Sequence, residues 1–433
     1  MNYYSLNKQS PIVNFKDATI AGQAPDKGLY FPETLPVIDN DLIGNIEKLP
    51  DAEIAFRVIK PFIGKEIPDT TLFDIVKETV NFPIPLKPVT EIISSLELFH
   101  GPTLAFKDVG ARFMSRCLGY FLKDEKRQVT VLVATSGDTG GAVANGFYDV
   151  PDVNVVILYP KGRVSPVQEK QLTTLGKNIT ALEVDGSFDD CQRMIKQAFN
   201  DKDVNQKIFL TSANSINVAR WLPQQFYYFF AYKQWKEKQQ PPVVCVPSGN
   251  FGNICAGILA KVSGLPLGHF IAACNVNDIV SEYLETQNLK PKDAVATLSN
   301  AMDVGNPSNF VRIIEMFQKE FPALKNNLSS LTVTDQQTVE TIKSVFHQHH
   351  YTLDPHGAVA YFALEKYLQK HQGEEGFILE TAHPVKFPEA VEQATNTKIP
   401  IPDALKHLMK QQKQSTEIGP VYEYFRDYLL QLD

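Results

Sequence analysis

One lysine of the chain lies in a setting that suits covalent chemistry with an aldehyde. Lys107 stands in the segment ELFHGPTLAFKDVGARFM, between the apolar run Leu104-Ala105-Phe106 and Val109. Apolar surroundings remove water from an amine and favour its neutral form, which is the nucleophilic one. Most lysines are solvated surface residues. The pattern around Lys107, and not the lysine alone, therefore predicts a side chain able to form a Schiff base.

Two glycine-rich turns have the composition of anion sites. Residues 135–141, TSGDTGG, follow the apolar run VTVLVA and precede a stretch of small residues. Residues 249–253, GNFGN, stand between PVVCVP and ICAGILAKV in the same way. Free N–H groups at a helix start, together with the positive end of the helix dipole, attract an anion, and glycine allows it to approach the backbone. Two such turns predict one or two ligands that carry two negative groups.

Each turn taken alone has a second interpretation, because glycine-rich turns also occur where the chain must simply reverse tightly. Neither turn has the spacing of a Walker loop or of a dinucleotide-binding fingerprint, and no Gly-Lys-Ser/Thr follows. These absences disfavour a nucleoside triphosphatase and a dehydrogenase.

A parallel sheet is the element that would position these groups. From about residue 128, short β-branched runs alternate with longer segments of helical periodicity, which is typical of βαβ units. The runs are VTVLVA, VNVVILYP, ITALEV, KIFLTS, PVVCVP, HFIAAC and GFILET. The first ninety or so residues are rich in proline and aromatics, with helices predicted around 39–48 and 70–78, and are expected to form a small domain or a wrapping arm.

Local signals mark several boundaries of these elements. Ser165 followed by Pro166 predicts a helix start, and Asn277 or Asp278 is a candidate cap for the helix IVSEYLE. Pro223 inside an apolar helical pattern predicts a kink or a fresh helix start. The run KEKQQPP, residues 236–242, is interpreted as a connection between two α/β halves.

Composition narrows the class of protein. A chain of 433 residues suggests two or three globular units, and a net charge of −7 sets up no attraction for nucleic acid or an anionic membrane. No stretch resembles a membrane-spanning helix or a secretion signal, so a cytoplasmic protein is expected. The five cysteines form no Cys-x-x-Cys pair, so we expect neither a disulfide framework nor a zinc site. The histidines at 347, 349 and 350 lack the spacing of a metal site, and no metal is expected.

Taken together, the motifs resemble the threonine synthase family of the bacterial and fungal kind. The matching segments, between about residues 24 and 390, are APDKGLYFPE, LFHGPTLAFKD, ATSGDTGGAV, PSGNFGN, MDVGNPSN, LDPHGAVAY and ETAHPVKF. The resemblance implies an α/β protein of pyridoxal-phosphate fold type II: two parallel-sheet domains with the cofactor in the cleft between them, plus a small N-terminal domain. The corresponding division is 1–90 for the N-terminal domain, 91–240 for the first α/β unit and 241–433 for the second.

The resemblance also assigns residues to the cofactor, pyridoxal 5'-phosphate. Lys107 would hold it as a Schiff base, Asp138 would lie near its phenolic oxygen, and Thr381 would meet the pyridine nitrogen. The residues implied for its phosphate are those of the second turn, Gly249, Asn250, Phe251, Gly252 and Asn253. An aspartate at position 138 is costly beside a phenolate and a carboxylate unless it is protonated or hydrogen-bonded.

The implied substrate is the small molecule O-phospho-L-homoserine, which reacts with water to give L-threonine and phosphate. By resemblance, the substrate carboxylate would bind at Thr135, Ser136, Gly137 and Thr139, and its phosphate at Asn214 and Arg220. Arginine suits a phosphate because its charged fork is planar. Arg220 next to Trp221 could also be a surface ion pair or a stacked cation. The protein is expected to be a monomer or a small homo-oligomer.

Three alternatives remain at this stage. A sibling lyase would release phosphate from a phosphorylated hydroxy-amino acid and give a keto acid. A serine or threonine dehydratase is disfavoured because its substrate would leave Asn214 and Arg220 without a purpose. A non-catalytic relative of the fold is disfavoured because Lys107, the second turn and Thr381 are all retained.

Overall fold

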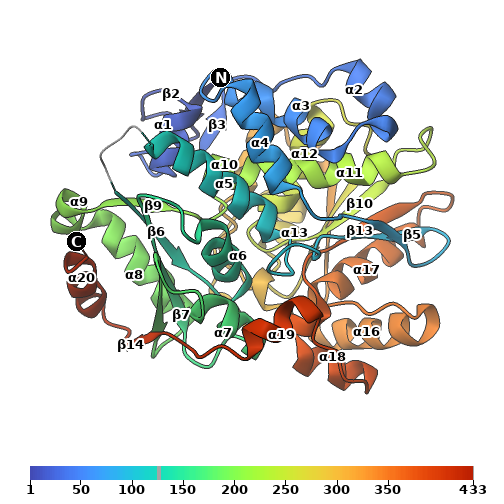
Figure 1. The fold of residues 1–433 in the computed structure, drawn as a ribbon. Coiled ribbons are helices and arrows are strands. Elements are labelled where there is room, and N and C mark those ends of the chain that lie inside the picture. The colour runs from blue at the N-terminus through green and yellow to red at the C-terminus, as the bar shows by residue number, and fades with distance from the viewer. Residues whose placement is uncertain (124–127, 433) are drawn as a thin grey trace.

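The computed structural model describes residues 1–123 and 128–432. These residues form three sheets with helices packed around them, and the N-terminal segment lies beside the helices that connect the two larger sheets (Figure 1).

The N-terminal segment contains a small antiparallel sheet of order β2-β1-β3. Its elements are β1 (Asn2–Ser5), β2 (Val13–Asn14), α1 (Phe15–Ala21), β3 (Tyr30–Pro32), α2 (Asn40–Asn45), η1 (Ile46–Lys48), α3 (Asp51–Ile63) and α4 (Asp69–Thr79). The helices expected around 39–48 and 70–78 are confirmed by α2 with η1 and by α4. The sequence reasoning missed α3, whose apolar residues recur at helical spacing and are buried.

The first large sheet is parallel and has the order β14-β8-β7-β6-β9. Its strands are β6 (Val129–Ala134), β7 (Val153–Pro160), β8 (Ile179–Val184), β9 (Phe209–Ser212) and β14 (Thr416–Ile418). The helices near it are α5 (Lys107–Leu122), α6 (Asp138–Phe147), α7 (Pro166–Thr173), α8 (Phe188–Asn200), α9 (Lys202–Lys207), α19 (Asp403–Met409) and α20 (Tyr422–Leu430). All six residues of β6 are buried, as expected for a strand covered on both faces.

The second large sheet has the order β12-β11-β10-β13-β5-β4, and only the edge strand β4 is antiparallel. Its strands are β4 (Leu86–Pro88), β5 (Ile93–Glu97), β10 (Val243–Pro247), β11 (Phe270–Cys274), β12 (Leu328–Thr332) and β13 (Gly376–Glu380). The helices of this half are α12 (Gly252–Val262), α13 (Ile279–Thr286), α14 (Phe310–Met316), α15 (Phe321–Asn327), α16 (Asp335–His349), α17 (Pro355–Leu368) and α18 (Pro388–Thr395), with the short turns η3 (Asn300–Met302) and η4 (Pro384–Lys386).

All seven expected strands are present, as β6 to β11 and β13, whereas β4, β5, β12 and β14 of the two large sheets were missed. The segments ISSLE, LSSLT and TEI contain too few apolar residues to stand out, and two of them lie at or near a sheet edge. Strand β5 pairs with β13, and β14 pairs with β8. Each of these two strands is separated by the expected boundary at residue 240 from most of the sheet that it joins. The division into 1–90, 91–240 and 241–433 stays a prediction.

The connection between the two sheets contains a fresh helix start near Pro223, as the sequence predicts. Helix α10 (Val218–Trp221) passes into the 3-10 turn η2 (Leu222–Gln225), which contains Pro223, and α11 (Phe226–Gln234) begins afresh after it. Residues 236–242 then lead into β10, as expected. Ser165 caps α7 with a complete capping box, whereas Asp278 precedes α13 without a side-chain capping bond.

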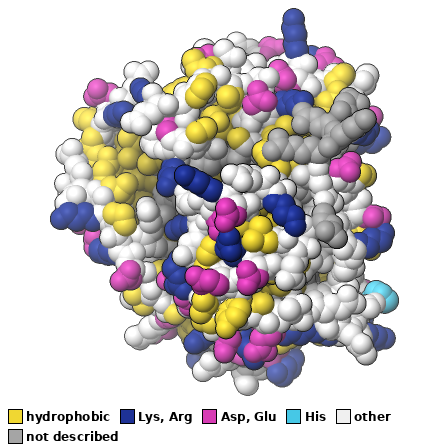
Figure 2. Space-filling view, turned by 90° about the vertical axis from the view of Figure 1, so that its left-hand side faces the viewer, with side chains coloured by type: hydrophobic (Ala, Val, Ile, Leu, Met, Phe, Trp, Pro, Cys, Tyr) yellow, Lys and Arg dark blue, Asp and Glu magenta, His cyan; other side chains and the backbone are white. Residues whose placement is uncertain are grey.

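The surface carries mixed charge. On the face drawn in Figure 2, Lys and Arg side chains lie among Asp and Glu side chains, with hydrophobic groups between them. Among residues 1–123 and 128–432, no helix combines the length and the apolar character that crossing a bilayer requires.

Candidate active site

The segment that precedes Lys107 is fastened to the end of β13. The N–H of Phe106 donates to the carbonyl of Thr381 at 2.9 Å, and the N–H of His383 donates to the carbonyl of Leu104 at 3.0 Å. Lys107 is the first residue of α5, so its position is fixed relative to the strand that ends beside Thr381. The structure thus brings together two residues that the sequence separates by more than 250 positions.

The amine of Lys107 is held in a setting that favours its neutral form. Burial is the largest cause that lowers the pKa of Lys107, and the charges of Lys386 and Arg220 lower it further, while Asp138 opposes them. The ring of Phe106 lies 5.0 Å from Nζ. The side chain as a whole is half-buried. A partly dehydrated amine without a fixed anionic partner is a suitable nucleophile.

The first glycine-rich turn is shaped by Thr135 at the end of β6. Its hydroxyl accepts hydrogen bonds from the N–H groups of Gly137 (2.9 Å) and Gly140 (2.8 Å). Gly137 has a φ of 134°, and a Cβ there would lie 2.4 Å from Cδ of Gln168, so the position requires glycine. Ser136 and Thr139 are half-buried. Two of the backbone donors are therefore used within the turn, and the role of Thr135 in binding a carboxylate stays a prediction.

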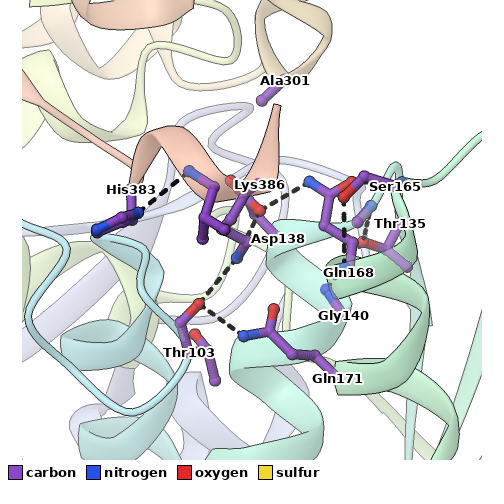
Figure 3. A network of polar contacts seen from close by, with 12 residues as sticks. Thr103, Thr135, Asp138, Gly140, Ser165, Gln168, Gln171, Ala301, His383 and Lys386 are labelled. Carbon is purple, nitrogen blue, oxygen red and sulfur yellow. Dashed lines mark hydrogen bonds and ion pairs between the residues drawn. The ribbon is translucent and has the colours of Figure 1, made fainter. Parts of the chain in front are cut away.

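Asp138, at the start of α6, has a buried lysine as its partner. Nζ of Lys386 lies 2.7 Å from Oδ1 of Asp138, and Nε2 of Gln168 donates to the same oxygen at 2.9 Å (Figure 3). Burial alone would raise the pKa of Asp138, but the charges of Lys386 and Lys107 and the two hydrogen bonds hold it well below its usual range. Asp138 is therefore ionised, and its cost is offset inside the protein.

Lys386 joins three segments of the site. Its side chain is fully buried, and Nζ also donates to the carbonyl of Thr103 at 2.9 Å (Figure 3). The same carbonyl accepts from Nε2 of Gln171 at 2.9 Å, and the N–H of Thr103 donates to Asp108 at 2.9 Å. The loop before Lys107, the start of α6 and the turn η4 are thus held together by one ammonium group.

The second turn, residues 249–253, precedes α12 and is tightly packed. Phe251 adopts a left-handed φ of 59°, and a Cβ at Gly249 would lie 2.6 Å from Cα of Met302. The side chain of Asn250 is used within the protein: Nδ2 donates to Ser215 at 2.9 Å, and Oδ1 accepts from the N–H of Ser308 at 2.7 Å. Asn250 therefore holds the turn in shape.

Asn253, in the first turn of α12, carries an unused buried donor. Its Oδ1 accepts from the hydroxyl of Tyr228 at 2.9 Å, which leaves Nδ2 buried without a partner in the described residues. An unpartnered N–H at a helix N-terminus fits an anion. Residues 249–253 thus fit the phosphate of the expected cofactor by shape and by donor chemistry.

Arg220 is a buried cation without an anion. It is 3% exposed, and within the described residues neither Nε nor Nη1 has a hydrogen-bond partner. Burial lowers the pKa of Arg220 to about 10, so it remains charged near neutral pH. A Cβ at Gly110 would lie 3.2 Å from Nε, which places the guanidinium beside the first turn of α5. Asn214 lies six residues earlier and is half-buried.

The sequence reasoning missed Lys386, Gln168 and the Thr103–Asp108 contact. A signal for Lys386 was available, because it stands between Val385 and Phe387 much as Lys107 stands between apolar neighbours. The partner of Asp138 lies 248 positions away, and no local pattern gives that pairing. The histidines 347, 349 and 350 lie at the end of α16, and the described part of the chain has no group of three or more metal-ligating side chains placed to hold a metal ion.

Known proteins match the whole chain. The model of the family described as pyridoxal-phosphate dependent enzyme matches residues 86–380, and models described as threonine synthase N terminus and threonine synthase C-terminal match residues 2–80 and 357–428. The threonine synthase of Haemophilus influenzae is 45% identical over 99% of this chain and 100% of its own. The crystal structure of threonine synthase from Escherichia coli superposes with a TM-score of 0.93 at 43% identity, covering 99% of both chains. That of a pyridoxal-phosphate-bound threonine synthase from Brucella melitensis gives 0.92 at 35% identity, covering 99% of this chain and 98% of the other. The chain belongs to the threonine synthase family of pyridoxal-phosphate-dependent enzymes.

Proposed function

We propose that this chain converts O-phospho-L-homoserine and water into L-threonine and inorganic phosphate at the site around Lys107. The single observation that carries the proposal is the buried guanidinium of Arg220, whose Nε and Nη1 have no partner in the described residues and which lies beside the first turn of α5. A buried cation without an anion is unfavourable in the free protein. A phosphorylated substrate supplies a second anion besides its carboxylate, whereas serine or threonine carries the carboxylate alone.

The cofactor would be held at three places. Lys107 would bond its amine to the aldehyde carbon, residues 249–253 would bind the phosphate, and Thr381 would meet the pyridine nitrogen. Unpartnered Nδ2 of Asn253 and the narrow fit at Gly249 support the second assignment. When bound, pyridoxal phosphate supplies an electron sink for negative charge on the substrate carbons. The hydroxyl of Thr381 is neutral and does not enforce protonation of the ring, so control of the proton falls to Lys107.

The first turn would orient the substrate through its carboxylate. Ser136 and Thr139 offer half-buried hydroxyls, and Gly137 lets the carboxylate approach the start of α6. Thr135 would act by holding the turn, because its hydroxyl already accepts two backbone N–H groups. Asp138 would lie near the cofactor's phenolic oxygen with its charge offset by Lys386.

Lys107 would act as the proton carrier. Burial lowers the pKa of Lys107, which favours the free amine, so it can take the proton from the α carbon and then return protons as the reaction proceeds. Arg220 and Asn214 would bind the γ-phosphate and stabilise its charge as it leaves. Lys107 would also take a proton from the β carbon as the γ-phosphate leaves. Water would then add at the β carbon, and protons returned to the γ and α carbons would complete threonine, while the remaining proton from water is released with phosphate.

The test is a balanced product assay with O-phospho-L-homoserine and the cofactor-loaded protein. We expect one threonine for each phosphate released, and no phosphate from the Lys107→Ala variant. Phosphate with a keto acid in place of threonine would identify the sibling lyase. Binding without release of phosphate would identify a non-catalytic relative and overturn the proposal.

Two further properties belong to the same proposal. All five cysteines are free and buried, which fits a protein of the reducing cytoplasm. The substrate is a small molecule, and we propose that the protein acts without nucleic acid or a membrane, as a monomer or small homo-oligomer. Sedimentation at working concentration tests the oligomeric state.

A further inference from the structure

The side chain of Lys386 is buried beside the candidate active site, in addition to the lysine that is expected to form the Schiff base. It is 0% exposed, and its Nζ contacts Oδ1 of Asp138 at 2.7 Å and the carbonyl of Thr103 at 2.9 Å. Burying an ammonium group is costly unless it is paired and hydrogen-bonded. A lysine placed in this way needs an explanation in the chemistry of its neighbours.

Asp138 has two lysines within electrostatic reach but is bonded to only one of them. Lys386 contacts its carboxylate directly, whereas no hydrogen bond or ion pair joins Asp138 to Lys107 in the described residues. Gln168 donates to the same oxygen as Lys386 and fixes the carboxylate in that orientation (Figure 3). The carboxylate whose charge acts most strongly on Lys107 is therefore already paired with a different lysine.

The consequence for Lys107 follows from the sign of each charge. A free carboxylate next to an amine favours the protonated amine, and a protonated amine cannot attack an aldehyde. A cation next to that carboxylate cancels this effect. We propose that Lys386 is a positioning residue that neutralises Asp138, so that the amine of Lys107 is available as the free base to bond the cofactor aldehyde. This inference rests on the proposed role of Lys107.

Other charged groups also act on the two lysines. Arg220 on α10 and Asp354 before α17 lie within electrostatic reach of Lys107. Asp354 is already engaged by Nδ1 of His356 at 2.5 Å, and Arg220 acts in the same direction as Lys386. Near Lys386 itself, Asp108 is bonded to Thr103, and burial lowers the pKa of His383 to about 4, so this imidazole is neutral. None of these groups replaces Lys386 as the partner of Asp138.

The experiment is a pH titration of the visible absorbance of the cofactor-loaded protein, which reports the proton on the Lys107–cofactor linkage and does not depend on turnover. In Lys386→Gln the charge of Asp138 is uncompensated, so we expect the titration midpoint to rise by roughly one pH unit or more. In Asp138→Asn the uncompensated charge is that of Lys386, so the midpoint should fall. The double variant Lys386→Gln/Asp138→Asn restores neutrality and should titrate close to the parent protein.

Two controls separate charge from structure. Lys386→Arg keeps the charge and should keep the midpoint, whereas a purely structural role for Lys386 would predict a similar disturbance in both variants. Lys398→Gln makes the same exchange in an ion pair with Glu392 whose lysine is 92% exposed, and it should change nothing. If Lys386→Gln does not fold, the fall in Asp138→Asn and its reversal in the double variant still decide the matter.

The inference is overturned if the midpoints of Lys386→Gln and Asp138→Asn both coincide with that of the parent protein, or if the double variant departs from it as far as either single variant. Failure of the proposed site is distinguishable. If Lys107→Ala keeps the visible absorbance, Lys107 does not hold the cofactor and the proposed function fails at its first step.

Discussion

The two buried cations of the site, Lys386 and Arg220, differ in whether the protein itself provides partners for their charge. Lys386 is bonded to Asp138 and to a backbone carbonyl, so its charge is balanced within the protein. Arg220 is buried to a similar degree, yet two of its nitrogens have no partner in the described residues. The charge of Lys386 is already balanced before any ligand binds, whereas burial of Arg220 becomes favourable only when an anion binds.

The difference separates residues that shape the site from residues that await a ligand. Asn253 resembles Arg220, because its Nδ2 is buried and has no partner among the described residues. Asn250 resembles Lys386, because its side chain is hydrogen-bonded to Ser215 and Ser308 within the protein. Unsatisfied buried donors are rare in folded proteins and call for an explanation. The proposed function assigns a phosphate group to each of them: that of the substrate to Arg220 and that of the cofactor to Asn253.

The largest effect on activity is expected for Lys107, because the charges of both Lys386 and Arg220 act on its amine. Lys107→Ala should lose the visible absorbance of the bound cofactor, and turnover should fall by roughly 10³-fold or more because nucleophile and proton carrier are removed together. Absorbance spectra and phosphate release measure the two losses. Lys123→Ala makes the same exchange at an exposed position following the same helix and should leave both unchanged. If Lys107→Ala keeps its turnover, the active site is not centred on Lys107, and the comparison of Lys386 with Arg220 loses its meaning.

The balanced pair is tested by unfolding. Asp138→Asn leaves the buried ammonium of Lys386 without its counter-charge, and breaking a buried pair in this way typically costs about 3–5 kcal/mol. Chemical denaturation of the cofactor-free protein measures the loss. A change smaller than about 1 kcal/mol, the scale of an exposed ion pair, would show that the pair is not balanced as described.

The same pair predicts a dependence of stability on pH. The pKa of Asp138 in the folded protein lies below its ordinary value of 3.8, so its contribution is complete above that pH and is lost as the pH falls below it. The free energy of unfolding should therefore decline less steeply in Asp138→Asn than in the parent protein when the pH is lowered through about 4. Parallel declines would contradict the ionised state of Asp138.

Replacing Arg220 should have the opposite result: a loss of activity without a loss of stability. Arg220→Met removes the donors for the substrate phosphate, and kcat/KM for O-phospho-L-homoserine should fall by about 10- to 100-fold, as for loss of hydrogen bonds to a charged group. The ligand-free protein should be as stable as before or more stable, because an unpaired buried charge is replaced by an apolar side chain. Steady-state kinetics and thermal unfolding measure both.

Arg220→Lys serves as the matched control, because it keeps the charge but loses the planar fork. It should fall between the parent protein and Arg220→Met in kcat/KM. If Arg220→Met loses as much stability as Asp138→Asn, then Arg220 also has partners within the protein, and the two cations do not differ as described.

The smallest effect is expected at Thr135, which shapes the first turn. Thr135→Val removes the acceptor for the N–H groups of Gly137 and Gly140 and should cost about 1 kcal/mol of stability, in the range of a lost helix cap. Thr135→Ser retains the hydroxyl and should stay close to the parent protein. A substrate KM that rises in Thr135→Val without loss of stability would instead indicate direct contact with the substrate.

The core of the fold was predictable because buried parallel strands are nearly continuous apolar runs. All seven such runs are strands, and Pro223 marks the helix start that its missing N–H predicts. β5 and β14 were missed because short strands that contain serine or glutamate have no clear period. Their membership of opposite sheets depends on tertiary pairing, which no local pattern encodes.

The candidate site divides in the same manner. Lys107 and the two turns could be found from their neighbours, because dehydration of an amine and exposure of backbone N–H groups are local effects. The balance of charge around Asp138 could not, because it depends on Lys386, 248 positions away, and on Gln168. Long-range ion pairs become visible only once the chain is folded.

The most direct test of the account is to identify which lysine bonds the cofactor. Reduction of the pyridoxal-phosphate-loaded protein with borohydride, followed by peptide mass mapping, fixes the label on the lysine that carries it. Lys107 is half-buried and has no ion pair with any of the described residues, whereas Lys386 is fully buried and paired. We predict the label on Lys107 alone. A label on Lys386, or on any lysine outside this site, would contradict the assignment from which the mechanism follows.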